Sequence, residues 1–363
     1  MTDGGSRLAR GWEKGFPPAP TRLLAAAGGS YRGLLGAREW LYAHGVLKSR
    51  ALPCPVVSVG NLTVGGTGKT PAVEIAVQTL SALGHRPAVV SRGYGRRTRG
   101  IHVVADTASI RLDADEAGDE PFLLARRLPG VPVVVGGNRY DTACLALERF
   151  GVTAIVLDDA FQHRTLKKSL EIVTARAQNP WGNGRLLPAG PLREPLAALA
   201  RADLVVATDA TRPVDASAVV ASVNEHAPGV PVLTAVFVPA ECWEASRMRP
   251  LPLAELEGKR LAAFAGIASP AAFATTLESA GVRVAEFARF ADHHWFTPAE
   301  VAGLDGRAGD LGVEGLITTE KDWVRLRKLP LPRRPLYVLS IRLVLTSDTS
   351  AWQAAFERAC PAS

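Results

Sequence analysis

Cysteine and long apolar runs are both scarce in this sequence of 363 residues, and each absence narrows the class of protein. The four cysteines, Cys54, Cys144, Cys242 and Cys360, are too far apart to have the spacing of a metal-binding or redox pair. A reduced cytosolic compartment is therefore expected. No stretch reaches about 18 uninterrupted apolar residues, and the first fifteen residues carry charges but no apolar core. The sequence thus predicts neither a membrane-spanning helix nor a secretory signal peptide.

Nucleic-acid binding has little support either, although the chain is basic. It carries 42 Lys and Arg against 35 Asp and Glu, a net charge of +7, but no basic run interleaved with aromatic residues. The positive charge is either a compositional bias or an attraction to anions such as a nucleotide, a phosphorylated substrate or an anionic membrane face.

Strand-like and helix-like segments alternate after residue 50. The expected strands are Val56–Gly60, Pro87–Ser91, Val131–Val135, Ala154–Leu157, Glu171–Thr174 and Leu204–Ala207. They are short, rich in Val or Ile, and separated by segments with helical spacing. This alternation predicts an α/β fold, with a largely parallel sheet covered by helices on both faces.

The length and the 47% hydrophobic content predict two domains with sizeable cores. We expect a core domain at residues 51–240, a Pro-rich linker at residues 241–258 and a smaller α/β domain at residues 259–363 that closes over the site. The strands expected near or in the smaller domain are Arg260–Ile267, Val282–Phe290, Gly315–Thr319 and Leu336–Ile341.

Residues 1–50 form a separate N-terminal segment that combines apolar and basic side chains. Leu34, Leu35 and Trp40 supply apolar surface, while Arg32 and Arg38 interrupt it. A basic, aromatic-bearing amphipathic helix of this kind can lie in a membrane interface. The alternative is a helix that packs on the protein's own core, and the pattern leaves both open.

A glycine-rich loop lies between the first expected strand and a helix that Pro71 opens, as in P-loop NTPases. It runs Gly60-Asn61-Leu62-Thr63-Val64-Gly65-Gly66-Thr67-Gly68-Lys69-Thr70. Glycines let backbone N–H groups surround phosphates, and the helix N-terminus adds a partial positive charge. Lys69 would contact the β- and γ-phosphates, and the Thr70 hydroxyl would hold Mg²⁺. Since the usual motif has glycine at the position of Thr63, the loop predicts nucleotide binding without defining its purpose.

Two acidic segments are candidates for the metal and the base. Asp158 and Asp159 follow an apolar strand directly, where the Mg²⁺-organising acid of such enzymes lies, although the pair could also cap a loop. Asp119 precedes Pro121 and could cap a helix. A kinase also needs a carboxylate that accepts a hydroxyl proton, and Asp119 is a candidate for this role.

Three further segments could bind ligands, although each has an equally good structural explanation. The basic loop at Ser91-Arg92-Gly93-Tyr94-Gly95 follows an expected strand. The segment from Leu187 to Pro195 contains an Arg193-Glu194 pair and is too rich in Pro and Gly for regular structure. Within Asp292-His293-His294, an imidazole paired with a carboxylate of the other domain is a simpler explanation than a metal site.

Taken together, these segments resemble the tetraacyldisaccharide 4′-kinase family of lipid A biosynthesis. The resemblance rests on ordered motifs: Val59 to Pro71, Ser91 to Gly95, Gly118-Asp119-Glu120-Pro121, Asp158-Asp159-Ala160-Phe161-Gln162-His163, Leu187 to Glu194, Asp292-His293 and Thr318-Thr319-Glu320-Lys321-Asp322. Thr63 fits this family, which has Ser or Thr there. Ala160 departs from it, since many members have Gly, and this would matter only if the backbone needed a positive φ.

The resemblance implies transfer of the γ-phosphate of ATP, with Mg²⁺, to the 4′-hydroxyl of a tetraacyldisaccharide 1-phosphate, giving lipid IVA. It also implies a peripheral position at the cytoplasmic face of a Gram-negative inner membrane, with the lipid substrate and the membrane surface as partners. We expect a monomer that binds no nucleic acid.

The same resemblance implies roles for individual residues. Asp119 would be the base, assisted by His293, and Lys69 would act on the phosphates. The nucleotide would contact Gly60, Asn61, Thr63, Gly65, Gly66, Thr67, Gly68, Lys69, Thr70 and Gln162. The metal would be surrounded by Thr70, Asp158, Asp159 and Glu194, and the substrate by Arg92, Tyr94 and Arg193.

The main alternative is a P-loop ATPase that drives a conformational change in a protein partner and has no small-molecule acceptor. Such a protein has no use for a loop basic enough to grip a sugar phosphate. A third possibility, a non-catalytic nucleotide-binding module, conflicts with the intact Lys69, Thr70 and Asp158.

Overall fold

The first lobe is built on a largely parallel sheet. The structure is a computed structural model that describes residues 18–361. Its strands are β1 (Val56–Gly60), β2 (Pro87–Ser91), β3 (His102–Ala105), β4 (Val133–Val135), β5 (Ala154–Asp158), β6 (Leu170–Arg176) and β7 (Leu204–Thr208). Neighbouring strands run parallel, except that β3 is antiparallel to β4. Every residue of β1, β2 and β5 is buried, as expected for a sheet covered on both faces. The predicted parallel sheet is confirmed.

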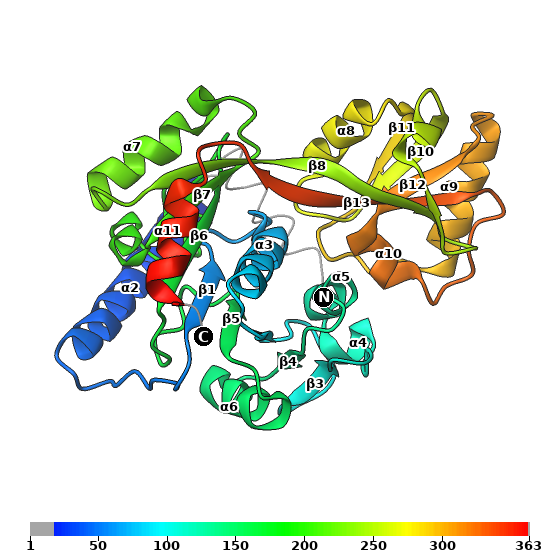
Figure 1. Cartoon of the computed structure of the whole chain (residues 1–363). Helices are drawn as coiled ribbons and strands as arrows, with labels where there is room; N and C mark the ends of the chain where they lie inside the picture. Colours follow the sequence, from blue (N-terminus) through cyan, green and yellow to red (C-terminus); the bar gives the residue numbers. More distant parts are fainter. Residues whose placement is uncertain (1–17, 362–363) are drawn as a thin grey trace.

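Helices cover both faces of this sheet because alternate residues of each strand point to opposite sides (Figure 1). On one face, Val57 and Val59 pack in a core with α3 (Lys69–Ala82) and α5 (Asp119–Arg127). On the other, Val56 packs in a core with α6 (Arg139–Phe150). The remaining elements of this lobe are α4 (Ala114–Ala117), α7 (Ser217–His226), η1 (Leu196–Arg201) and η2 (Pro213–Ala216).

Two long strands continue the sheet from the first lobe into the second. β8 (Val232–Glu244) pairs in parallel with β7 and antiparallel with β13 (Leu336–Leu345). Figure 1 shows both strands crossing between the lobes. The prediction of a linker at residues 241–258 is therefore wrong at its start, since residues up to Glu244 belong to β8 and β9 (Arg249–Leu251) pairs with it. Pro239 is tolerated in β8 because it lies where the pairing with β13 is irregular.

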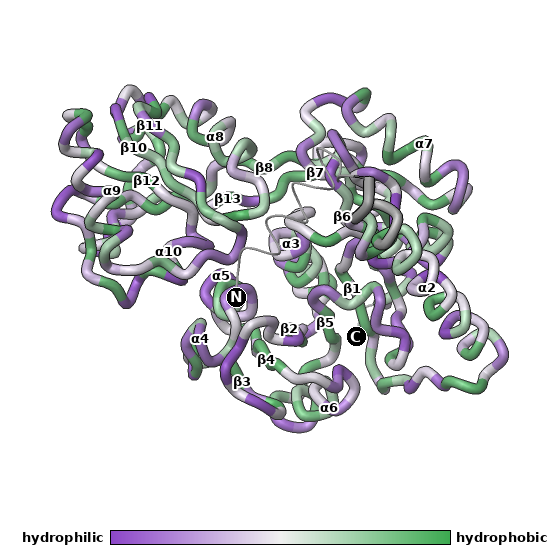
Figure 2. The backbone as a smooth tube through the Cα atoms, turned by 180° about the vertical axis from the view of Figure 1, so that it is seen from behind, coloured by the Kyte–Doolittle hydropathy of each residue, from purple (hydrophilic) through white to green (hydrophobic). Residues whose placement is uncertain are grey.

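The second lobe is a smaller α/β unit on the same sheet. It contains β10 (Arg260–Ala265), β11 (Arg283–Arg289), β12 (Gly315–Thr319), α8 (Pro270–Ser279), α9 (Pro298–Asp310), α10 (Glu320–Leu326) and η3 (Leu253–Leu256). The described strands follow the order β11-β10-β12-β13-β8-β7-β6-β1-β5-β2-β4-β3. Seen from behind in Figure 2, hydrophobic positions follow the strands of both lobes. The last helix, α11 (Ser350–Ala359), returns to the first lobe, where Trp352 donates a hydrogen bond to Thr79 of α3.

Helix α2 (Pro18–Ala43) lies on the outside of the first lobe (Figure 1). Its inner face packs on the protein through Leu35 and Tyr31, whereas Leu34 and Trp40 are 70% and 56% exposed. Part of the helix thus packs on the protein, whereas the membrane-interface interpretation of its exposed face stays a prediction. Residues 1–17 of the N-terminal segment lie outside the described residues. Within residues 18–361, no helix combines the length and the apolar character that crossing a membrane requires.

Candidate active site

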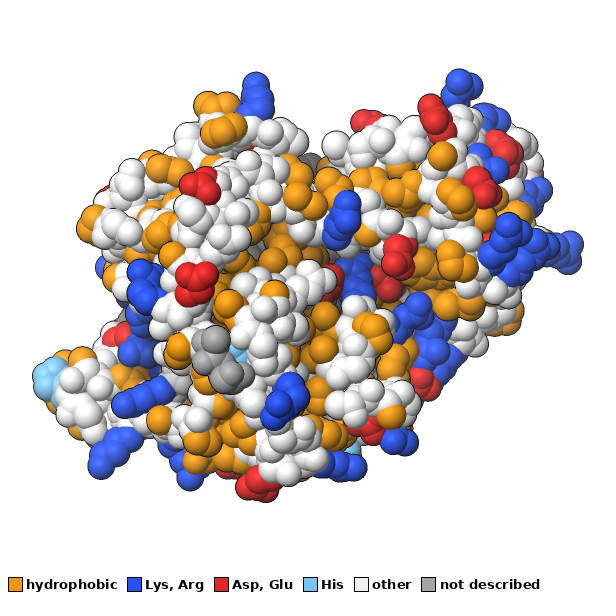
Figure 3. All heavy atoms as spheres, viewed as in Figure 1, with side chains coloured by type: hydrophobic (Ala, Val, Ile, Leu, Met, Phe, Trp, Pro, Cys, Tyr) orange, Lys and Arg blue, Asp and Glu red, His pale blue; other side chains and the backbone are white. Residues whose placement is uncertain are grey.

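A cleft of about 740 Å³ lies between the two lobes and collects most of the predicted site residues. The first lobe contributes the glycine-rich loop, the start of α5 and the segments after β2 and β5. The second lobe contributes the segments after β10, β11 and β12. Figure 3 shows the groove between the lobes, with acidic and basic side chains along it. The carboxyl ends of parallel strands meet at this edge of the sheet, where open α/β proteins bind their ligands.

The glycine-rich loop has the backbone shape that phosphate binding requires. Gly65 has a φ of 111° and Gly68 a φ of 85°, which only glycine adopts readily. A Cβ at Gly68 would lie 2.7 Å from Cζ of Phe237, so no side chain fits there. Helix α3 begins at Lys69, and both Lys69 and Thr70 line the cleft. The start of a helix therefore lies at the cleft, which suits an anionic ligand.

Two threonines that were not among the predicted site residues hold this loop in place. The Thr67 hydroxyl lies 2.7 Å from that of Thr174 on β6, and Thr208 at the end of β7 donates to the Thr67 carbonyl at 3.2 Å. Asn61 adds a hydrogen bond from its amide to the Thr67 hydroxyl at 3.0 Å. No motif could have marked Thr174 and Thr208, because only the strand order places them beside the loop.

Some of the predicted nucleotide residues support the loop from behind. The side chain of Gln162 lines the cleft and donates to the Asn61 carbonyl at 2.8 Å. Gly60, Asn61 and Thr63 do not line the cleft. Thr63 instead forms a bridge with Leu192, so the segment around Leu192 packs against the start of the loop.

Asp158 is a buried carboxylate, and one of its two oxygens accepts no hydrogen bond from the described residues. Its Oδ2 accepts a hydrogen bond from Ser91 at 2.9 Å, whereas Oδ1 has no hydrogen-bond partner within the described part of the chain. Burial and the nearby carboxylates of Glu120 and Asp159 raise the pKa of Asp158 to about 7. A cation would offset both effects, so this position fits a bound metal ion. No group of three or more His, Cys, Asp or Glu residues within 18–361 forms a metal cage, so Mg²⁺ here would rely on phosphates and water as further ligands.

Asp159 is engaged differently, although it is the next residue. Arg193 donates to both of its oxygens, at 2.8 and 3.0 Å, and Lys69 lies 3.8 Å from Oδ1. Its φ is 49°, in the left-handed region. Ala160 does not share this conformation, so alanine at the position where the resemblance implied glycine causes no backbone strain.

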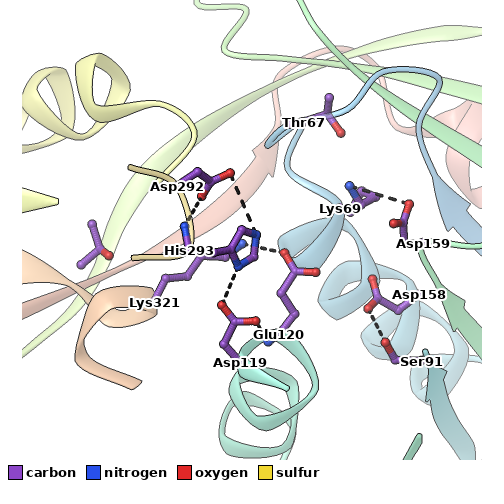
Figure 4. Close-up of polar contacts among 12 residues, drawn as sticks. Thr67, Lys69, Ser91, Asp119, Glu120, Asp158, Asp159, Asp292, His293 and Lys321 are labelled. Atoms are coloured by element: carbon purple, nitrogen blue, oxygen red, sulfur yellow. Dashed lines mark hydrogen bonds and ion pairs between the residues drawn. The ribbon is translucent and has the colours of Figure 1, made fainter. Parts of the chain in front are cut away.

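The contact predicted between Asp119 and a histidine of the other domain is formed. Oδ2 of Asp119, on α5, lies 2.9 Å from Nδ1 of His293, which follows β11 (Figure 4). Burial alone would raise the pKa of Asp119, but the hydrogen bond from His293 and the charge of Arg325 outweigh it and hold the pKa well below its usual range. The same hydrogen bond raises the pKa of His293. His293 has a φ of 59°, so its position depends on the surrounding loop.

Of the remaining predicted residues, the structure brings Arg92, Tyr94 and Arg193 to the cleft but not Glu194. The Tyr94 ring is 77% exposed, and its centroid lies 6.2 Å from that of His293. Glu194 is buried, and its two oxygens accept hydrogen bonds from Arg38 of α2 and Arg201 of η1. The prediction that Glu194 surrounds the metal therefore does not fit its position. Arg193 turns toward Asp159, whereas its neighbour Glu194 pairs with these arginines away from the cleft.

Sequence reasoning missed three charged residues at this site. Glu120 receives a hydrogen bond from Lys321 at 2.9 Å, across the boundary between the lobes. Arg325, on α10, contacts Asp119. Glu120 and Lys321 belong to motifs that the resemblance used, so a signal existed for them. Arg325 lies three residues beyond the last motif and had no such signal.

A parallel sheet with a P-loop-like glycine-rich loop, a buried carboxylate beside it and an Asp–His pair across the cleft is the arrangement of a P-loop phosphotransferase. The family described as tetraacyldisaccharide-1-P 4′-kinase matches residues 20–360, and this chain belongs to that family. The tetraacyldisaccharide 4′-kinase of Syntrophus aciditrophicus is 39% identical over 353 residues, covering 93% of this chain and 94% of the relative. That of Geobacter sulfurreducens is 41% identical over 359 residues, with 97% of each chain covered.

A solved structure agrees with these sequence similarities. The crystal structure of LpxK from Aquifex aeolicus in complex with ATP matches with a TM-score of 0.73 and 31% sequence identity. The match covers 93% of this chain and 99% of the other chain. The two-lobed α/β architecture described above is therefore that of a known kinase fold.

Proposed function

We propose that this chain transfers the γ-phosphate of ATP to the 4′-hydroxyl of a tetraacyldisaccharide 1-phosphate, giving lipid IVA. Family membership and the ATP bound to the relative from A. aeolicus support this function. The main support for this function within the chain itself is that the glycine-rich loop and the Asp119–His293 pair line the same cleft. Figure 4 shows the two groups, with Lys69 and Asp159 on one side and His293 and Asp119 on the other.

On the donor side, Lys69 and the backbone N–H groups of the loop bind the phosphates of ATP. Asp158 and Thr70 would hold Mg²⁺, because Oδ1 of Asp158 is buried and has no hydrogen-bond partner among the described residues, whereas Asp159 is occupied by Arg193. When bound, Mg²⁺ would neutralise part of the negative charge of the phosphates. Asp159 then positions Arg193 and Lys69 beside the phosphates.

On the acceptor side, Asp119 accepts the proton of the 4′-hydroxyl. The hydroxyl oxygen forms its bond to the γ-phosphorus as the bond to the leaving oxygen of ADP breaks. His293 donates to Asp119 and orients it. Arg92 and Tyr94, which line the cleft beside this pair, contact the acceptor.

Binding at a membrane surface extends this proposal. The acceptor carries acyl chains, and α2 exposes Leu34 and Trp40 on its outer face, as interfacial helices do. We place the protein peripherally at the cytoplasmic face of the inner membrane. A monomer suffices, because both sides of the cleft come from one chain.

One experiment tests the reaction and the base together. Purified protein is incubated with γ-labelled ATP, Mg²⁺ and a tetraacyldisaccharide 1-phosphate, and labelled lipid is measured for the wild type and for Asp119→Ala. Loss of the base should lower the rate by roughly 10²–10⁴-fold. If the wild type labels no lipid, the proposed function is wrong. If Asp119→Ala labels lipid at a comparable rate, another group is the base. ATP turnover stimulated by a protein, without labelled lipid, would favour the partner-regulated ATPase.

A further inference from the structure

Arg325 is a buried charge that joins the two lobes at the reacting end of the cleft. It belongs to α10 in the second lobe, and its side chain is 0% exposed. A buried guanidinium is costly unless its donors are used, so its partners indicate what it does. Its main partner is Asp119 in the first lobe, 206 positions earlier in the chain.

The contacts of Arg325 fix the guanidinium in one orientation. Its Nε and Nη2 donate to Oδ2 of Asp119 at 2.9 and 2.5 Å. Its Nη1 donates to the Gly266 carbonyl at 2.8 Å and lies 3.4 Å from Oδ1 of Asp322. Asp322 is itself held by the Thr319 hydroxyl at 2.7 Å. The guanidinium thus reaches Asp119 from a rigid support in the second lobe.

These contacts divide the two oxygens of Asp119 between different tasks. Oδ2 accepts from Arg325 and from His293. Oδ1 accepts one hydrogen bond, from the backbone N–H of Glu120 at 3.0 Å. Each carboxylate oxygen has about two lone-pair positions. At Oδ2 the two nitrogens of one guanidinium share a position and His293 takes the other, whereas Oδ1 has one donor and can accept one more. The acceptor hydroxyl can take that place.

Asp119, and not Arg325, determines which nitrogen of neutral His293 carries the proton. Nη2 of Arg325 lies 3.2 Å from Nδ1 of His293, farther than the 2.9 Å between Nδ1 and Oδ2 of Asp119. A guanidinium has only donors, and a carboxylate has only acceptors. A proton on Nδ1 therefore satisfies the shorter contact, and Nε2 is left free to accept.

We propose that Arg325 is a positioning residue for phosphoryl transfer: it fills Oδ2 of Asp119 so that Oδ1 receives the acceptor hydroxyl, and it keeps Asp119 ionised. The inference rests on the function proposed above and assigns it a residue outside the motifs. Arg325 acts through Asp119 and touches neither ATP nor the acceptor.

The pH dependence of the reaction separates this role from simple structural support. Asp119 faces His293, Arg325, Glu120 and Lys321, and His293 also faces Asp292. Burial raises the pKa of Asp119, and Arg325 counteracts it. Without the arginine, the pKa of Asp119 should rise, and the protonated fraction should grow as the pH falls. Activity at acid pH should then be lost in a range where the wild type keeps it.

The test compares Arg325→Gln, which removes the charge, with Arg325→Lys, which keeps it. Full-length protein is assayed for lipid phosphorylation between pH 5 and 9, with melting temperature and ATP-analogue binding as checks on folding. Arg325→Gln should lower kcat about 100-fold at neutral pH through lost orientation, leave KM for ATP within about twofold, and show a new loss of activity toward acid pH. Arg325→Lys should lower kcat about tenfold, and its activity at acid pH should depend on pH as that of the wild type does.

Two further variants make the outcome decisive. Arg327→Met removes an arginine that pairs with Asp113 across the same lobe boundary but outside the cleft, and it should leave kcat and the pH profile unchanged. In Arg325→Gln combined with His293→Gln, activity should still be lost as the pH falls. The loss should begin at a higher pH than in Arg325→Gln alone, because Asp119 has lost both partners. If the double variant keeps its activity at acid pH, the loss in Arg325→Gln comes from protonation of His293 and not of Asp119, and the proposal is wrong.

Each remaining result also decides the question. A folded Arg325→Gln with a wild-type pH profile overturns the proposal, even if its rate is lower. If Arg325→Gln does not fold, Arg325→Lys decides, since an unchanged kcat there excludes a positioning role. A wild-type protein that labels no lipid contradicts the proposed function instead, which distinguishes the two failures.

Discussion

At the scale of single residues, Asp158 and Asp159 are chain neighbours with opposite electrostatic surroundings. Asp158 is 1% exposed, and among residues 18–361 its carboxylate accepts one hydrogen bond, from Ser91. Asp159 is paired with Arg193 and lies near Lys69. The reason is the backbone, since the left-handed conformation at Asp159 turns the chain between the two side chains. A charge at Asp158 is thus unfavourable in the folded protein without a cation, whereas a charge at Asp159 is favourable.

We expect Asp158→Asn and Asp159→Asn to change stability in opposite directions. At pH 8 without Mg²⁺, Asp158→Asn should raise the melting temperature, because it removes repulsion from Glu120 and Asp159. Asp159→Asn should lower it, because Arg193 loses its carboxylate. The kinase rate of Asp158→Asn should fall about 100-fold or more, if Asp158 holds the metal. Differential scanning fluorimetry and the lipid assay measure both, and a lower melting temperature for Asp158→Asn would contradict this assignment.

At the scale of elements, helix α2 has one face that contacts the protein and one face that is exposed. Its inner face is held by polar contacts: Tyr31 donates to the Arg193 carbonyl at 2.9 Å, and Arg38 pairs with the buried Glu194. On its outer face Leu34 and Trp40 are exposed, and the Trp40 ring stacks on His44, which follows the helix. Because its anchoring contacts lie beside Arg193, the helix is tied to the segment that holds Asp159.

Replacing Leu34 and Trp40 by serine should weaken vesicle binding without changing the reaction on detergent-dispersed substrate. Burying an apolar side chain contributes about 1.5–3 kcal/mol, so binding to anionic vesicles should fall at least tenfold. Val214→Ser with Val220→Ser is the matched control, since these exposed residues lie at η2 and α7, away from α2. Co-sedimentation measures the bound fraction. Equal binding by both double variants would exclude α2 as the membrane-binding face.

At the scale of the whole molecule, the lobes are joined by a continuous sheet and by buried ion pairs. Arg127 of α5 pairs with Glu74 of α3 and with Glu320 of α10, and it also donates to the Ile341 carbonyl of β13 at 3.0 Å. One side chain thus links both lobes and a strand that crosses between them. The Asp119–His293–Arg325 cluster depends on this arrangement, because its members come from both lobes.

Arg127→Met should therefore be strongly destabilising. Removing it leaves two carboxylates without their partner, and breaking a buried pair in this way costs about 3–5 kcal/mol. The control is Arg111→Met, which removes a solvent-screened pair with Asp106 and should lower the stability far less. Urea unfolding gives both free energies. Equal losses in the two variants would mean that Arg127 does not hold the lobes together.

Much of the fold and part of the site follow from sequence because they depend on local order. The strands β1, β2 and β12 begin and end at the predicted residues, since each apolar run is bounded by turn or helix signals. The glycine-rich loop needs no tertiary information, because its glycines, Lys69 and Thr70 are consecutive. The ordered motifs are likewise local, and family membership, which the comparisons confirm, could be inferred from them.

The sequence by itself thus determined the parallel sheet, the phosphate-binding loop and the family. Only the tertiary structure decided that β8 extends into the start of the expected linker, that Glu194 faces α2 and not the cleft, and that Arg325 contacts the predicted base. The physical reason is distance along the chain. A strand, a glycine turn or a motif is defined by neighbouring residues, whereas the partner of a buried charge depends on how segments up to 206 positions apart are packed.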